Sequence, residues 1–222
     1  YIICNDVIVK DRIIDYGINS KKVRAIQAFS KQYLDFKPVD LSDDLISFMK
    51  ARQPLVSSYL LIRPTFDLKT LFHALKEVQK VRPNFGMVVM GSNTTSDDMD
   101  PEEVTRLVRK LGLDHHLFWV GDLEHDHFLT ILSKTSLFVR TYIYDGVCSS
   151  VLEALAFNIP VVACENPHRP AGVFIFKTGD IKDLTKKILQ ALSQNERHSS
   201  QDKSIEVQDT VNEEAQLLLE LA

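Results

Sequence analysis

Two acidic side chains stand close together in the segment RTYIYDGVCSSVLEALAFNIPVVA, which covers residues 140–163. Asp145 lies in an expected loop, and Glu153 follows after seven intervening residues, in a segment of helical period. The first N–H groups of a helix have no partner inside the helix, so they favour an anion, above all a phosphate. Gly146 lets a ligand approach the backbone closely. We therefore expect an anion site at four successive amides, those of Val147, Cys148, Ser149 and Ser150.

Two basic residues stand earlier in the chain, at places where they could reach the same anion. Arg63 follows the apolar run YLLI at 59–62, and Lys69 comes six residues later, at the expected start of a helix. An Arg fork and a Lys point charge can together hold a diphosphate without a metal. Gly91 ends the next apolar run and leaves room for a flat ring or a ribose. These residues predict a nucleoside diphosphate ligand.

The two acids would contact different parts of such a ligand. We expect the helix to begin near Ser150, which puts Glu153 in its first turn, facing the pocket, where it accepts hydrogen bonds from two ribose hydroxyls. Asp145, in the loop before the helix, would reach hydroxyls on a group attached to the second phosphate, such as a sugar. The pattern therefore predicts a nucleotide sugar site.

Residues 57–192 carry the elements that must position this site. Short apolar runs alternate there with segments of helical period, and the runs are YLLI (59–62), GMVVM (86–90), LFWV (117–120), LFV (137–139), PVVA (160–163) and VFIF (173–176). Such alternation is typical of a parallel sheet with helices on both faces, a Rossmann-like doubly wound α/β domain. Ligands of such sheets bind at the carboxyl ends of the strands, where the loops described above begin.

The flanking segments have a different character. Residues 1–35 predict one more strand–helix–strand unit, and residues 36–56 form a Pro- and Asp-bearing connection between domains. Residues 193–222 predict a polar linker and a final amphipathic helix over 204–221. The chain begins at Tyr1 without an initiator Met, so we interpret it as a piece of a longer protein.

The overall composition excludes several classes of function. The 222 residues carry a formal net charge of −4, which gives no basic field for nucleic acid. The three cysteines lack CxxC spacing, which favours a reducing compartment over disulfides or structural zinc. No apolar run approaches the roughly 20 residues that span a bilayer, so we expect at most a peripheral membrane association.

The motifs above resemble the carboxyl-terminal domain of family-four retaining glycosyltransferases of the GT-B fold. That family has two acids separated by seven residues, here Asp145 and Glu153, with a glycine after the first acid and Ala154 after the second, before FNIPVVA. Its Arg and Lys pair matches Arg63 and Lys69, and its strand end F-x-G matches FWVGDL at Gly121. The resemblance covers about residues 1–192. Within the family, FVRTYIYDG and RPAGVFIFKTGDIKDL are similar to bacterial polysaccharide-assembly members, including lipopolysaccharide enzymes.

The resemblance implies a function and a set of roles. It implies transfer of a hexose-type sugar from a UDP or GDP donor to a glycan or lipid-linked acceptor, with retention and without a metal or cofactor, in the cytoplasm or on the inner membrane face. The acceptor would bind a domain of which only residues 1–35 are present, so this piece alone would be inactive. Arg63, Lys69 and Asp145 would be catalytic. The donor would be bound by Gly91, Gly121, Arg140, Gly146, Val147, Cys148, Ser149, Ser150 and Glu153.

The sequence also departs from the family pattern. Asp145 is one methylene shorter than the usual Glu, Cys148 replaces a second loop glycine, Arg140 replaces the commoner Pro, and Ile62 replaces the glycine before the Arg. Two other functions stay open: a non-catalytic nucleotide-sugar-binding domain and a sugar-nucleotide epimerase of the same fold.

Several of these residues also have simpler interpretations. Ser150 and Glu153 match the capping box S-x-x-E, and Arg140 could pair with Asp145. Arg63 and Lys69 could be solvated charges. The run from Glu124 to His127 brings together potential metal ligands, but Asp126 fits better as the N-cap of a helix.

Other enzyme classes find little support. A position at a helix N-terminus would make Cys148 a possible nucleophile, although only His168 offers itself as a base. The chain has no G-x-S-x-G for a hydrolase and no G-x-G-x-x-G after its first strand for a dinucleotide enzyme.

Overall fold

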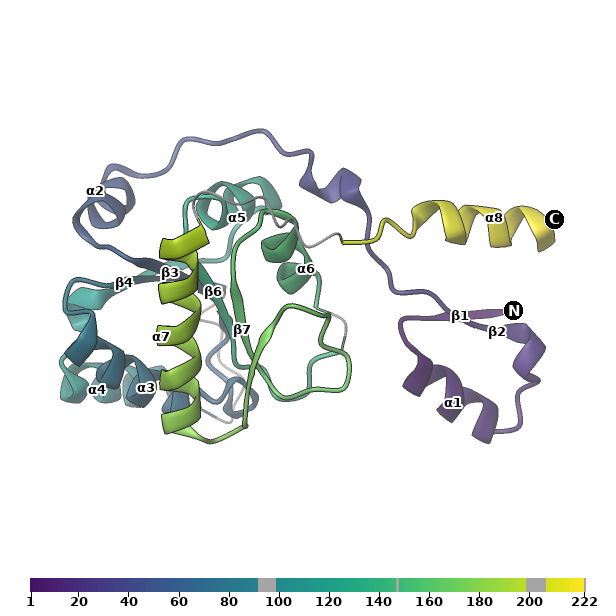
Figure 1. Cartoon of the computed structure of the whole chain (residues 1–222), viewed down its shortest axis with the longest axis horizontal. Helices are drawn as coiled ribbons and strands as arrows, with labels where there is room; N and C mark the ends of the chain where they lie inside the picture. Colours follow the sequence, from purple (N-terminus) through teal and green to yellow (C-terminus); the bar gives the residue numbers. More distant parts are fainter. Residues whose placement is uncertain (92–98, 147, 199–206, 222) are drawn as a thin grey trace.

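The structure is a computed structural model that describes residues 1–91, 99–146, 148–198 and 207–221. Six parallel strands form the central sheet, in the order β5-β4-β3-β6-β7-β8 (Figure 1). They are β3 (Leu55–Tyr59), β4 (Gly86–Met90), β5 (Leu117–Gly121), β6 (Leu137–Arg140), β7 (Val161–Cys164) and β8 (Phe174–Phe176). From β3 the chain moves outward to β4 and β5, then returns to β6 on the other side of β3. The border between β3 and β6 is therefore the point where a doubly wound sheet opens a ligand crevice.

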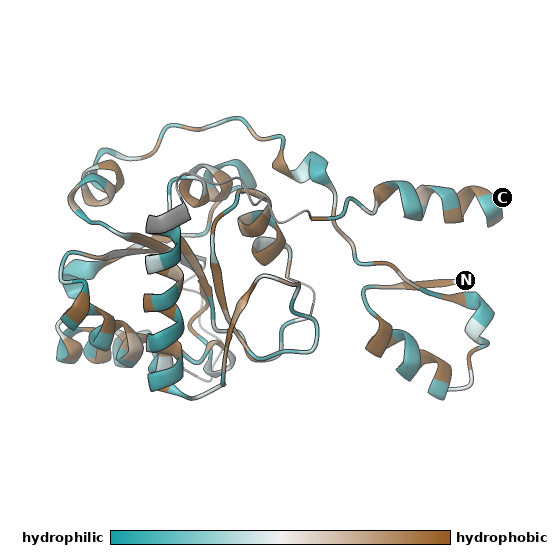
Figure 2. Cartoon of the chain, viewed as in Figure 1, coloured by the Kyte–Doolittle hydropathy of each residue, from teal (hydrophilic) through white to brown (hydrophobic). Residues whose placement is uncertain are grey.

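Helices cover both faces of this sheet (Figure 1). One face carries α3 (Leu68–Val81), α4 (Pro101–Leu111) and α7 (Ile181–His198). The other carries α2 (Asp43–Ala51), α5 (His125–Leu132) and α6 (Ser149–Ala156). The strands of the sheet are mostly apolar while the helices alternate apolar and polar residues, as amphipathic helices on a buried sheet do (Figure 2). The predicted Rossmann-like doubly wound fold is confirmed.

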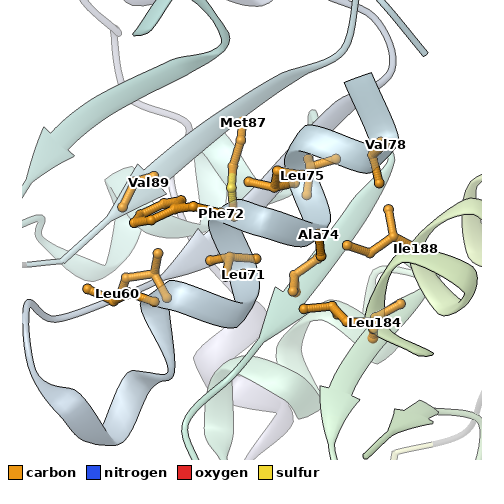
Figure 3. Close-up of a cluster of buried hydrophobic side chains, with 14 of the residues drawn as sticks. Leu60, Leu71, Phe72, Ala74, Leu75, Val78, Met87, Val89, Leu184 and Ile188 are labelled. Atoms are coloured by element: carbon orange, nitrogen blue, oxygen red, sulfur yellow. The ribbon is translucent and has the colours of Figure 1, made fainter. Parts of the chain in front are cut away.

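Two hydrophobic clusters result from the alternation of side chains along the strands. Met87 and Val89 of β4 point to the face of α3 and α7, where they join Leu71, Phe72 and Leu75 (Figure 3). Their neighbours Val88 and Met90 point to the opposite cluster, under α5 and α6.

The first strand of the sheet starts earlier than the run YLLI predicts. β3 covers Leu55–Tyr59, so only Tyr59 of that run lies in the strand. Because of its two serines, the segment LVSSY is not a continuous apolar run, although both serines are buried and hydrogen-bonded. The Ser57 hydroxyl lies 3.0 Å from Thr135 Oγ1, and the Ser58 hydroxyl donates to the carbonyl of Val139 at 2.6 Å. Satisfied hydroxyls are compatible with a buried strand.

The segment 36–56, expected to be a connection, contains a helix that belongs to the sheet domain. Ser42 caps α2, and its Leu45 and Met49 enter the second hydrophobic cluster beside Leu55. Helix α7 runs on to His198, past the expected linker start at Ser193.

The two ends of the chain form a smaller unit. Strands β1 (Ile2–Cys4) and β2 (Val23–Ala25) pair in parallel and flank α1 (Val7–Asp15), as predicted for residues 1–35. Near them lies α8 (Val211–Leu221), which begins later than the predicted 204, although residues 199–206 are outside the described range (Figure 1). Hydrogen bonds between Phe29 and Thr210 hold the two ends together: the Thr210 amide donates to the Phe29 carbonyl, and the Phe29 amide donates to the Thr210 hydroxyl. None of the helices in the described part of the chain combines the length and apolar character needed to cross a bilayer.

Candidate functional site

A cavity of about 290 Å³ opens at the carboxyl edge of the sheet, at the border between β3 and β6. Its walls come from the ends of β3, β4 and β6 and from the amino-terminal parts of α5 and α6. The lining residues are Tyr59, Met90, Gly91, Leu123, His125, Phe128, Arg140, Cys148, Ser149, Ser150 and Glu153. Six of the predicted donor-site residues, namely Gly91, Arg140, Cys148, Ser149, Ser150 and Glu153, are thus brought together.

The start of α6 forms one wall of the cavity. Its N-cap is Cys148, whose side chain makes no capping hydrogen bond, and whose carbonyl accepts from the amides of Val151 and Leu152. The amides of Ser149 and Ser150 precede the first helical bonds, and in the described part of the chain they have no partner. They are available to an anion in the cavity. Val147, also expected to contribute, lies outside the described residues.

Glu153 faces the cavity from further along the helix than predicted. Because α6 begins at Ser149, Glu153 lies in its second turn and not in the predicted first turn. The capping box with Ser150, an alternative from the sequence, does not form, because the N-cap is Cys148. Its side chain is 6% exposed, and Oε1 lies 2.8 Å from His125 Nε2. Burial raises the pKa of Glu153, and the hydrogen bond and charge of His125 counteract this only in part.

Asp145 is held between two arginines instead of facing the cavity. Arg140 bonds both carboxylate oxygens, with Nε at 3.0 Å and Nη2 at 3.1 Å, and Arg169 Nη1 donates at 2.8 Å. All three side chains are at most 8% exposed. Burial alone would raise the pKa of Asp145, but the bonds and charges of Arg140 and Arg169 outweigh it, and the pKa lies below its ordinary 3.8. The pairing of Arg140 with Asp145, an alternative from the sequence, is confirmed.

Arg140 connects this ion cluster to the cavity that it lines. Its guanidinium lies within 5.8 Å of the ring centres of Tyr59, Phe66 and Tyr142, and Nη1 donates to the carbonyl of Tyr59 at 3.2 Å. Three aromatic rings and a bidentate carboxylate fix its position. Arg169 is tied equally well, donating to the carbonyls of Cys164 and Tyr142. Arg169 was not among the predicted site residues, and its only signal in the sequence is the RPAG segment of the resemblance.

Arg63 and Lys69 do not line the cavity. Both are exposed: Arg63 precedes a single 3-10 turn at Pro64–Phe66, and Lys69 is the second residue of α3. Neither makes an ion pair within the residues that the structure describes. Their loop is nevertheless bonded to the loop of Asp145, since the Thr65 carbonyl accepts from the Ile143 amide at 3.0 Å. The Phe66 carbonyl also accepts from the Thr141 hydroxyl.

The three predicted glycines have different surroundings. Gly91 has φ 120°, and a Cβ there would lie 2.3 Å from the Leu60 carbonyl oxygen, so the backbone packing itself requires glycine. Gly121 has φ 88°, does not line the cavity, and accepts from the Gly91 amide at 2.9 Å. A Cβ at Gly146 would meet nothing within 4 Å, which leaves open space beside the start of α6.

The run from Glu124 to His127 has a structural role that the sequence did not indicate. Glu124, not Asp126 as predicted, is the N-cap of α5, and His125 is turned toward Glu153. Within the described ranges, no three His, Cys, Asp or Glu side chains gather closely enough to hold a metal ion.

Comparison with known proteins gives concordant results. Among curated proteins, the chain is 23% identical over 190 residues to the lipopolysaccharide 1,6-galactosyltransferase of Escherichia coli K12, covering 82% of this chain and 51% of that protein. The chain therefore spans about half the length of that relative. It is also 24% identical over 95 residues to an uncharacterised glycosyltransferase of Methanocaldococcus jannaschii, covering 43% of this chain and 22% of the other.

Solved structures share the fold. HepE of Anabaena, in complex with UDP, superposes with a TM-score of 0.73 at 16% identity, over 99% of this chain and 62% of that one. The carboxyl-terminal domain of LpcC, a group 1 glycosyltransferase of Francisella tularensis, superposes with a TM-score of 0.61 at 19% identity, over 75% and 88%. The family model described as glycosyl transferases group 1 matches residues 50–207, more than half of the sequence. The chain accordingly belongs to the group 1 glycosyltransferases and has the fold of the carboxyl-terminal half of a GT-B enzyme.

Proposed function

We propose that this chain binds the nucleoside diphosphate sugar from which a retaining glycosyltransferase transfers a hexose to a glycan or lipid-linked acceptor. The acceptor would bind elsewhere in a longer protein, at the cytoplasmic face of a membrane when it is lipid-linked. The product would belong to a cell-surface polysaccharide. Loss of the sugar breaks its C1–O bond to the diphosphate, on which negative charge grows as the bond lengthens.

The observation that carries this proposal is the pairing of an open helix start with a buried carboxylate across one cavity. The amides of Ser149 and Ser150 supply positive partial charge for a phosphate. Arg140 lines the same wall, and its cluster with Arg169 and Asp145 keeps one net positive charge. Glu153 supplies oxygens that can only accept, which suits two ribose hydroxyls. A nucleoside diphosphate presents both chemistries at once.

The related proteins support a nucleotide sugar donor. The Anabaena structures were solved with UDP and with UDP-glucose, and the Escherichia coli relative is named as a galactosyltransferase of lipopolysaccharide. These ligands make a UDP-hexose the first donor to test.

In this proposal Arg63 and Lys69 stabilise the departing diphosphate, where their charge is worth most in the transition state. Both side chains are exposed, and their loop is hydrogen-bonded to the loop of Asp145. The proposal therefore requires the two side chains to rotate toward the diphosphate, while the backbone of the loop stays in place. Asp145 would act on the sugar mainly by fixing Arg140 and the loop 141–146, since its oxygens already accept three hydrogen bonds.

A calorimetric titration of the chain with UDP, GDP, ADP and their glucose conjugates tests the proposal. Ligand at about 100 times its dissociation constant should also stabilise the fold by about 2.7 kcal/mol. Glu153→Ala should abolish this effect, whereas Glu102→Ala, which removes a carboxylate 83% exposed on α4, should leave it intact. No stabilisation by any of these ligands, or equal stabilisation of the Glu153 variant, would contradict the proposal.

The reactivity of Cys148 is a second readout, which tests whether the ligand binds in the cavity. Cys148 lines it, whereas Cys4 and Cys164 are buried. Bound UDP should therefore slow the reaction of Cys148 with a thiol reagent, and Cys148→Ser gives the background rate.

Retention of anomeric configuration is tested on the complete enzyme, by determining the configuration of its first product by NMR. An inverted product would contradict retention.

One observation favours the second candidate, a domain that binds a nucleotide sugar without turnover. The acid that the resemblance makes catalytic, Asp145, is engaged by two arginines and does not line the cavity. Transfer by the complete protein to a glycan acceptor distinguishes the two: binding without transfer under every acceptor tried favours the non-catalytic domain.

A further inference from the structure

His125 is the first residue of α5, and it projects over the same cavity as Glu153 of α6. Its Nε2 lies 2.8 Å from Glu153 Oε1. An ionised carboxylate can only accept, so Nε2 carries the proton and donates it. The bond crosses between two helices whose residues are 28 positions apart in the chain.

The imidazole is held in place by two aromatic rings. Phe128, one turn further along α5, stacks on it with 6.3 Å between centroids and an interplanar angle of 10°. Tyr33, from the 3-10 turn Lys31–Leu34, meets it edge-on at 6.3 Å and 87°. The side chain of His125 is 46% exposed, so these contacts, and not burial, set its direction.

Glu153 depends on this contact for its orientation. Its carboxylate is buried, and among the residues that the structure describes His125 is the partner of Oε1, while Oε2 has none. The terminal torsion of a glutamate is soft, so one anchored oxygen decides where the other points. With Oε1 held by His125, Oε2 remains to accept from a ligand in the cavity.

We infer that His125 is a positioning residue of the donor site: it fixes the carboxylate of Glu153 so that this group accepts hydrogen bonds from the ribose of the nucleotide. This role rests on the proposed function, because it needs a nucleoside diphosphate in the cavity. His125 acts through Glu153, without touching the reacting atoms.

A double-mutant cycle on the chain tests this role, with UDP, GDP and ADP as probes in calorimetry. His125→Ala should raise the dissociation constant of the nucleotide that binds by about tenfold, the effect of one hydrogen bond to a charged group. In a Glu153→Gln background the same change should have an effect below about twofold. His125→Gln, which keeps an N–H donor, should restore most of the affinity. His127→Ala, on the same helix and outside the cavity lining, is the matched control and should change nothing.

The ribose part of the inference has its own probe. The penalty of His125→Ala should disappear for the 2′,3′-dideoxy form of the same nucleotide, because no hydroxyl then needs Glu153. A penalty that persists with the dideoxy form would overturn the role.

The remaining outcomes separate this inference from the proposed function. If Glu153→Gln weakens nucleotide binding and His125→Ala does not, the positioning role is wrong and the donor site stands. If His125→Ala weakens binding equally in both backgrounds, His125 contacts the ligand directly and the inference is again overturned. If no nucleotide binds the unchanged chain, the donor site fails and the inference fails with it.

Discussion

The two carboxylates Asp145 and Glu153 stand at the two ends of one motif, but the fold gives them opposite environments. Asp145 accepts three hydrogen bonds from two buried guanidinium groups, and its pKa lies below the ordinary value. Glu153 has one histidine partner and borders the cavity, and its pKa lies above the ordinary value. Asp145 thus accepts three hydrogen bonds, whereas Oε2 of Glu153 has no hydrogen-bond partner among the described residues.

The difference shows that spacing alone does not assign a role to an acid. An acid whose lone pairs are nearly all used holds the structure together, since a buried charge must be paired. An acid with an unused oxygen beside a cavity can serve a ligand. Asp145 bonds Arg140 and Arg169, whereas Glu153 lines the cavity and is, in our proposal, the carboxylate that binds the ligand.

The largest expected effect follows from breaking the Asp145 cluster. Asp145→Asn leaves Arg140 and Arg169, both buried, without their counter-charge, and should lower the free energy of unfolding by about 3–5 kcal/mol. Urea unfolding monitored by circular dichroism measures this. A variant as stable as the unchanged chain would show that the cluster contributes nothing to the fold, and that Asp145 is free for a direct role on the sugar.

Removal of one cation should have a smaller effect on the same cluster. Arg169→Gln leaves Asp145 bonded to Arg140 but removes the donors to the Cys164 and Tyr142 carbonyls. We expect a loss of about 2 kcal/mol, the scale of hydrogen bonds to charged groups. The same unfolding assay applies, and a loss as large as that of Asp145→Asn would mean that Arg140 alone cannot hold the carboxylate.

The matched change at the other acid, Glu153→Gln, should affect nucleotide binding more than the stability of the fold. Glu153→Gln keeps the shape of the side chain and removes a charge that burial disfavours, so the free energy of unfolding should change by less than about 1 kcal/mol. Nucleotide affinity should nevertheless fall, as calorimetry with UDP would measure. Strong destabilisation by Glu153→Gln would erase the contrast between the two acids.

Much of this arrangement could be predicted from the sequence, because it depends on local patterns. The alternation of apolar runs and amphipathic segments predicts a parallel sheet, and the position of loops after the strands places residues such as Gly91 and Ser149 at its carboxyl edge. Asp145, Gly146 and Glu153 are close in sequence, so their common loop and helix were also predictable.

The partners of the two acids could not be predicted in the same way. Arg169 reaches Asp145 across 24 positions and His125 reaches Glu153 across 28, and no local periodicity encodes such contacts. The predicted start of α6 near Ser150 is right to within one residue, but the N-cap is Cys148, although Ser150 is the better N-cap by residue type. The start of β3 was not predicted for a similar reason: the hydroxyls of its buried serines are hydrogen-bonded to residues distant in sequence.

The smallest expected effect is a difference in pH dependence between the two acids. The titratable or charged groups that line the cavity together with Glu153 are His125 of α5, Arg140 and Cys148. Because the folded pKa of Glu153 is raised above its ordinary 4.5, its ionised form costs stability at neutral pH, and that cost is removed as the pH falls through the folded pKa. Between pH 7 and pH 4.5 the chain should therefore gain stability relative to Glu153→Gln.

The contribution of Asp145 to stability should depend on pH with the opposite sign, and in a lower pH range. Its folded pKa lies below 3.8, so the stability that it contributes is complete above that value and is lost as the pH falls through the folded pKa. Unfolding titrations of the unchanged chain and the two amide variants, each across the acidic range, separate the two contributions. If the difference from Glu153→Gln is flat between pH 7 and pH 4.5, His125 compensates the burial of Glu153 completely. The two carboxylates would then be equally well paired, and the availability of Glu153 for a ligand would have to rest on its place at the cavity alone.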